Sequence, residues 1–155
     1  MSYESDIQDW TNQFRTAIRE DVKQLTKDTQ ANIVLKTAID TGRARSSWNI
    51  NPGLSADLSV TPPLAVRPHF GIIAVPQGVA PLTKGQAFTA AFGQHHNLER
   101  LTEPVATISN NLDYILGLEN GTGSRQFAPG EMFSNNVFAA LDEAEKLGYN
   151  ATLTL

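Results

Sequence analysis

Residues 6–28 read DIQDWTNQFRTAIREDVKQLTKD, and this stretch predicts the longest element of the chain. Its apolar side chains recur every three or four residues, which places them on one side of an α-helix. They are Ile7, Trp10, Phe14, Ile18, Val22 and Leu25. The sequence therefore predicts a long amphipathic helix near the N-terminus. The helical pattern resumes at Ala31, and we expect it to end at Gly42, because glycine readily adopts the left-handed conformation that ends helices.

The opposite side of this helix carries four basic residues at helical spacing. They are Arg15, Arg19, Lys23 and Lys27, and acidic residues are interspersed among them. Mixed charges of this kind are typical of a solvated helix face. We favour that interpretation over a binding patch.

Composition indicates one folded domain over residues 1–155. Hydrophobic residues make up 41% and charged residues 18%, and no apolar run is long enough to cross a membrane. There is no cysteine, which excludes disulfides and thiolate metal sites, and the N-terminus lacks a secretory pattern. The net charge is −4, and residues 101–155 carry seven acidic but only two basic side chains. This balance argues against a broad DNA-gripping surface.

The pattern changes to alternation after the helical region. Trp48 and Ile50 alternate with asparagines, which predicts a strand with both side chains on its inward face, and Pro52-Gly53 suits a type II turn. A second strand is expected at about residues 56–60. Most of the eight prolines fall between residues 61 and 87, which predicts an irregular, proline-rich excursion.

The remainder of the chain predicts a short helix at 87–100, a strand at 105–109, a helix at 131–146 and a final alternating segment at 151–155. In the 131–146 helix one face holds Phe133, Val137, Leu141 and Ala144. We therefore predict an α+β fold, in which a long N-terminal helix and a C-terminal helix pack on a small, mainly antiparallel sheet.

Chemical motifs are sparse. Residues 120–133 read NGTGSRQFAPGEMF, but a phosphate-binding P-loop needs Lys and Ser or Thr after its last glycine, and Glu131 and Met132 follow here. His95 and Glu99 lie one helical turn apart next to His96, and this group is the best metal candidate. Two ligands do not make a site, so we expect no metal, no cofactor and no catalytic residues.

Two separated stretches resemble a known family. Residues 40–48, DTGRARSSW, resemble the D-T-G-R-x-R-x-x-W signature of the tail-completion or neck proteins of long-tailed bacteriophages, which include minor tail proteins. Residues 110–121, NNLDYILGLENG, and 128–132, APGEM, are similar to later elements of that family, in the same order. Residues 61–100 match no part of it.

The resemblance implies a virion structural protein, not an enzyme, made in the host cytoplasm. Such a protein forms a ring, with six subunits expected, at the head-proximal end of the tail or in the neck, and it helps join head to tail. Its implied partners are itself, the tail tube protein and the neck or connector proteins. DNA passes through the ring without sequence-specific binding, and no membrane is involved.

The residues assigned under this hypothesis fall into two groups. Structural roles are expected for Gly42, Trp48, Tyr114, Glu119, Gly121, Pro129 and Gly130. Contacts with a neighbouring subunit or partner are expected for Arg43, Arg45, Arg125 and Phe127, since arginine and aromatic residues are enriched at interfaces. For Phe127 the alternative is a place in the chain's own core. For Arg43 and Arg45 the alternative is simple solvent exposure.

Two other functions stay open on the residues alone. A nucleic-acid-binding module would use Arg15, Arg19, Lys23, Arg43 and Arg45. A small metal-dependent hydrolase would use His95, His96 and Glu99. Both rank below the virion protein.

Overall fold

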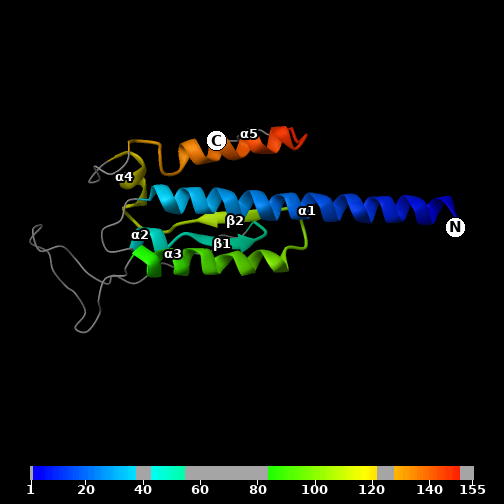
Figure 1. Ribbon diagram of the computed structural model, residues 1–155, viewed down its shortest axis with the longest axis horizontal. Coiled ribbons are helices and arrows are strands. Elements are labelled where there is room, and N and C mark those ends of the chain that lie inside the picture. The colour runs from blue at the N-terminus through cyan, green and yellow to red at the C-terminus, as the bar shows by residue number, and fades with distance from the viewer. Residues whose placement is uncertain (1, 38–42, 55–83, 122–127, 151–155) are drawn as a thin grey trace, which may run out of the picture.

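The computed structural model describes residues 2–37, 43–54, 84–121 and 128–150. A long helix, α1 (Tyr3–Lys36), runs along the molecule between α5 (Ser134–Lys146) on one side and a small sheet on the other (Figure 1). The second side of the sheet is covered by α3 (Lys84–Phe92) and the 3-10 helix η2 (Gly93–Arg100). Two short helices, α2 (Arg43–Ser46) and α4 (Ile115–Glu119), complete the described elements. This is the predicted α+β arrangement.

The first helix is longer than predicted at its start and shorter at its end. The Ser2 side chain accepts a hydrogen bond from the Ser5 N–H, and Glu4 and Asp6 lie in the first turn, where carboxylates favour the helix dipole. The predicted end at Gly42 is wrong, because α1 stops at Lys36 and Thr37 is extended, with φ −77° and ψ 125°. Gly42 itself lies outside the described residues.

The sheet has two described strands, β1 (Asn49–Pro52) and β2 (Ala106–Ser109), paired antiparallel with Ile50 opposite Ile108. Gly53 follows β1 with φ +91°, as the predicted turn requires, and its N–H donates to Val105 O at 2.8 Å. The expected strands at 56–60 and 151–155, and the excursion at 61–83, lie outside the described residues.

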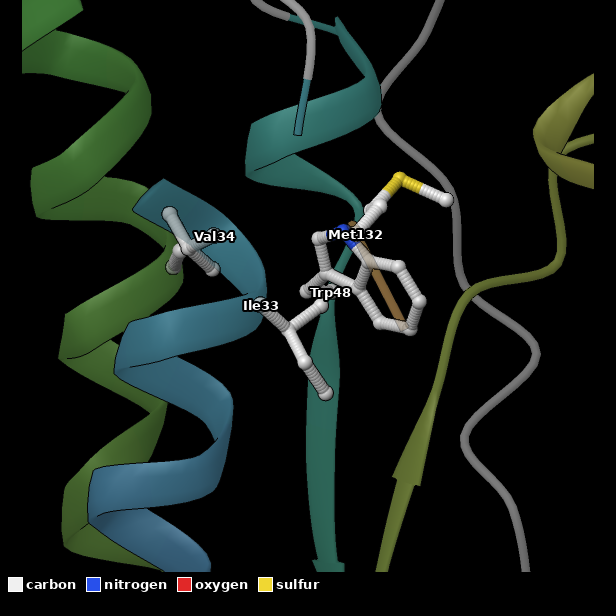
Figure 2. Packing of buried hydrophobic residues seen from close by; sticks show 5 residues of the cluster. Ile33, Val34, Trp48 and Met132 are labelled. Atoms are coloured by element: carbon white, nitrogen blue, oxygen red, sulfur yellow. The ribbon is translucent and has the colours of Figure 1, made fainter. Parts of the chain in front are cut away.

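The core gathers around Trp48. Ile33, Val34, Trp48, Ala91 and Met132 form one buried cluster, so it joins α1, the start of β1, α3 and the segment before α5. Figure 2 shows Ile33 and Met132 beside the Trp48 ring. Trp48 and Ile50 are both buried, which confirms the inward face predicted for them. No helix of the described residues is long and apolar enough to span a membrane.

Burial along the first helix is uneven. Gln30, Ile33 and Val34, in its C-terminal part, are fully buried. The N-terminal half projects past the ends of α5, α3 and the sheet (Figure 1), and Trp10 and Phe14 are exposed there. The predicted stripe therefore exists, but the chain covers only part of it.

Candidate functional site

The described parts of the two signature segments, residues 43–48 on one side and 110–121 with 128–132 on the other, meet at one end of the molecule. Asn110 Nδ2 donates a hydrogen bond of 3.0 Å to Ala44 O, and the Arg43 guanidinium lies 6.0 Å from the centre of the Tyr114 ring. Trp48 stacks on Phe133, with ring centres 6.0 Å apart and planes 5° from parallel. Segments more than 60 residues apart in the chain therefore build one local structure around α2 and α4.

Arg45 is buried inside the protein. Its side chain is therefore not accessible for the subunit contact that was predicted for it. Its exposed fraction is 5%, and its Nε and Nη2 donate to Thr37 O at 2.7 Å and Leu35 O at 3.3 Å. Its guanidinium also lies 4.9 Å from the centre of the Phe88 ring, within cation–π range. Arg45 thus binds carbonyls at the C-terminal end of α1, and burial lowers its pKa.

Arg43 differs from its neighbour, because its side chain is only partly buried and lies against Tyr114. Tyr114 precedes α4 and is 40% exposed. The predicted contact of Arg43 with another subunit stays a prediction. So do those of Arg125 and Phe127, which lie outside the described residues.

Trp48 is held by polar contacts as well as by packing. Its indole Nε1 donates to Thr37 Oγ1 at 2.9 Å, and Thr37 Oγ1 donates in turn to Ile33 O at 2.7 Å. Gln30, fully buried on α1, donates through Nε2 to Trp48 O and Ala91 O. The side chain of Trp48 is thus hydrogen-bonded to Thr37, just after α1, and its backbone carbonyl is hydrogen-bonded to Gln30, within α1.

The Gln30 amide also fixes the role of His95. Because both N–H groups of Gln30 are bonded to carbonyls, its Oε1 must accept, and His95 Nε2, at 2.7 Å, must be the donor. Burial lowers the pKa of His95, and the nearby Lys27 charge acts in the same direction. The histidine is therefore part of a hydrogen-bonded network inside the protein.

The metal candidate suggested by the sequence is not assembled. His95 Nε2 is bonded to Gln30, while Glu99 is exposed and lies 3.7 and 3.9 Å from the ammonium groups of Lys23 and Lys27. His96 is exposed on the same 3-10 helix. Within the part of the chain that the structure describes, no three His, Cys, Asp or Glu side chains come together as a metal site.

The basic residues of the nucleic-acid alternative do not form one surface either. Arg45 is buried, and Lys23 forms an ion pair of 2.8 Å with Glu20, whose hydrogen bond raises the Lys23 pKa. Arg19 donates to Thr16 on its own helix. The side chains of Lys23 and Lys27 are only 14% and 31% exposed and lie near Glu99 of η2, so the solvated face predicted for α1 is wrong at these two residues.

The structural residues around the glycine-rich stretch do come together, as a clamp formed by Glu119, Gly121, Pro129 and Gly130. Gly130 N–H donates to Glu119 O at 2.8 Å, which ties the two sides of residues 122–127. Gly121 has φ +76°, and a Cβ there would lie 2.9 Å from Pro129 Cγ. The described residues on both sides of positions 122–127 are therefore held close together, and the chain turns a corner there.

The carboxylate of Glu119 extends the clamp to α5. It accepts hydrogen bonds from Phe133 N–H at 2.8 Å and from Ser134 N–H at 2.9 Å, so it satisfies two donors at the start of that helix. The α4 end carries exposed apolar side chains next to this clamp, and we call Arg43, Tyr114, Leu116 and Phe133 the α4 surface. Leu116 is 72% exposed, although its apolar neighbours in the sequence do not indicate a surface position.

Comparisons with family models, with curated proteins and with solved structures found no match to this chain.

Proposed function

We propose that this protein is a structural component of a bacteriophage virion, a tail-completion or neck protein that forms a ring at the head-proximal end of the tail. One observation carries the proposal: the two segments that resemble the family signatures pack on each other. Asn110 bonds Ala44, and Arg43 lies over Tyr114, so the signature residues act as one structural unit. A shared unit gives a physical reason for the two signatures to occur together.

The α4 surface is the contact between subunits in this proposal. Tyr114 exposes part of its ring beside the partly buried Arg43, and Leu116 and Phe133 are exposed as well. Tyrosine, phenylalanine and arginine are enriched at interfaces. The glycine-rich stretch enters and leaves at this same end, between Gly121 and Ala128. A head-to-tail contact made by such a surface closes into a ring when the rotation between subunits permits, and we propose six subunits.

Assembly is the direct test. Purified protein, alone and mixed with tail tubes, should form rings in electron micrographs and a multiple of the 16.9 kDa chain mass by light scattering. Rings capping the tubes are expected at one end only. A strict monomer under both conditions contradicts the proposal.

The residues within the corner give a second test. Phe127→Ala and Arg125→Ala should abolish ring assembly and leave the melting midpoint of the monomer unchanged. Matched controls are Phe138→Ala, an exposed phenylalanine on α5, and Arg100→Ala, an exposed arginine on η2, which should assemble normally. A lowered midpoint for monomeric Phe127→Ala places that ring in the core and contradicts the interface role.

A further inference from the structure

The corner contains the one Asn-Gly pair of the sequence, Asn120-Gly121. Asn120 is exposed at the end of α4, and Gly121 belongs to the clamp. An asparagine followed by glycine is chemically labile, because glycine has no side chain to shield its backbone nitrogen from the asparagine side chain. That nitrogen can attack the side-chain carbonyl carbon and form a succinimide ring. The backbone geometry decides whether the ring closes.

The closed clamp holds the pair in a geometry that prevents ring closure. The ring forms only when Cβ of Asn120 and the nitrogen of Gly121 are eclipsed about the Cα–C bond of Asn120. The ψ angle of Asn120 is 5°, so its own backbone nitrogen is eclipsed with the Gly121 nitrogen, and Cβ is turned away. Gly121 N–H also donates to Leu118 O at 3.1 Å. Ring closure therefore requires a rotation of ψ that breaks this hydrogen bond.

The same rotation opens the clamp. Gly121 packs closely on Pro129, since a Cβ on Gly121 would lie only 2.9 Å from Pro129 Cγ. The residue before the pair, Glu119, accepts the Gly130 N–H at 2.8 Å. A rotation between Glu119 and Gly121 therefore cannot keep both contacts, because one lies on each side of the rotating bond. The reactivity of Asn120 is thus coupled to the state of the clamp.

We propose that Asn120 is a self-modification site, which the closed clamp protects and the open clamp exposes. In the open form the Gly121 nitrogen bonds to Asn120 Cγ and loses its proton. The Cγ–Nδ2 bond breaks, and Nδ2 leaves as ammonia with that proton. Water then adds to a carbonyl carbon of the succinimide and breaks the bond of that carbon to the Gly121 nitrogen. The products at position 120 are isoaspartate and aspartate.

The isoaspartate product holds the clamp open. Its main chain runs through Cβ and Cγ, so the path from Glu119 to Gly121 is one carbon longer than before. The Gly121 N–H then no longer reaches Leu118 O in the observed geometry. The product also carries a carboxylate next to that of Glu119. Opening is therefore reversible before the reaction and permanent after it. This chemistry takes place within a single chain and is independent of ring formation.

Peptide mapping measures the modification. Trypsin releases residues 101–125 as one peptide, in which Asn110 and Asn111 are internal references for Asn120. At mildly alkaline pH, Asn120 should convert on the order of 25-fold more slowly in the folded protein than in the same synthetic peptide, because opening breaks two hydrogen bonds that are each worth about a factor of five. Equal rates in the protein and the peptide would overturn the proposal.

A clamp variant tests whether the clamp itself gives the protection. Pro129→Ala removes the ring that packs on Gly121 and should speed the conversion of Asn120 several-fold. Pro104→Ala, at an exposed proline, is the matched control, and Ile33→Val, in the core, is the control for general destabilisation. Both controls should convert at the wild-type rate. A wild-type rate for Pro129→Ala, or an equal acceleration by Ile33→Val, would overturn the proposal.

Hydrogen exchange tests the lasting opening. The modified chain has an additional negative charge, so anion exchange separates it from the unmodified chain. Its Gly121 and Gly130 amide hydrogens should exchange faster, because both lose their carbonyl partners, while the Ile33 amide hydrogen in α1 should exchange as before. Unchanged protection of Gly130 in the isoaspartate form would overturn the lasting opening.

Discussion

The carboxylate of Glu119 accepts a hydrogen bond of 2.9 Å from the Ser134 N–H. Glu119 is the last residue of α4, and Ser134 is the first residue of α5. The same carboxylate accepts the Phe133 N–H. We expect Glu119→Gln to lower the free energy of unfolding by about 1–2 kcal/mol, because the amide nitrogen cannot accept and one donor at the helix start loses its partner. Urea unfolding measures this change. Glu103→Gln, at an exposed position, is the control, and an equal effect in both variants would contradict a capping role.

Gly121 is required by backbone conformation and by space. Its φ is +76°, and a Cβ added to it would meet Pro129 Cγ at 2.9 Å. Gly121→Ala should therefore cost about 2–3 kcal/mol in thermal or urea unfolding. Gly53→Ala separates the two causes, since Gly53 has φ +91° but open space around it, and should cost only about 1 kcal/mol. Equal losses at the two glycines would mean that Pro129 contributes nothing.

Trp48 should be the most costly aromatic residue to remove. Trp48→Ala empties the centre of the buried cluster and should destabilise the protein by about 3 kcal/mol or more. Trp48→Phe keeps much of the ring but loses the hydrogen bond to Thr37, and should cost about 1 kcal/mol. Phe138→Ala, exposed on α5, should change stability by only a few tenths of a kcal/mol. A loss of that small size for Trp48→Ala would contradict its central place.

His95 should make stability depend on pH. Burial lowers its pKa below the usual 6.5, so the folded state favours the neutral ring. Its contribution to stability is therefore complete above about pH 6.5 and is lost as pH falls toward the folded-state pKa. The urea midpoint should drop between pH 7.5 and 5.5, and His95→Gln should reduce that drop. His96→Gln, at an exposed neighbour, should leave it intact; a drop unaffected by His95→Gln would assign it to other groups.

Local patterns predicted the elements well where the chain's own packing agrees with them. The strands around Ile50 and Ile108 and the helix ending at Lys146 follow from alternation and helical spacing. The end of α1 did not follow, because it depends on Arg45 binding the carbonyls of Leu35 and Thr37, a contact between residues eight to ten apart. Asn49 was expected to face outward, yet it is buried against η2, where Gln94 donates to its side chain.

The candidate site was predictable only in part, for a related reason. Spacing shows which residues share a helix face, but not what covers that face, so the exposure of Trp10 and the internal role of Arg45 required the three-dimensional arrangement. Likewise, the sequence places His95 and Glu99 one helical turn apart. In the structure His95 is hydrogen-bonded to Gln30, whereas Glu99 lies near Lys23. The contact of Asn110 with Ala44 links segments whose separation no local pattern spans.

The clamp at Glu119 and Gly130 has a consequence for how this chain can vary. Since the hydrogen bond between these residues and the packing of Gly121 on Pro129 join the two flanks, residues 122–127 can be exchanged or lengthened while the surrounding helices keep their anchor. The free energy of closing a loop grows only slowly with its length, by about 0.6 kcal/mol for each doubling. This position therefore suits peptide grafts, and related chains can acquire different specificities here on an unchanged scaffold.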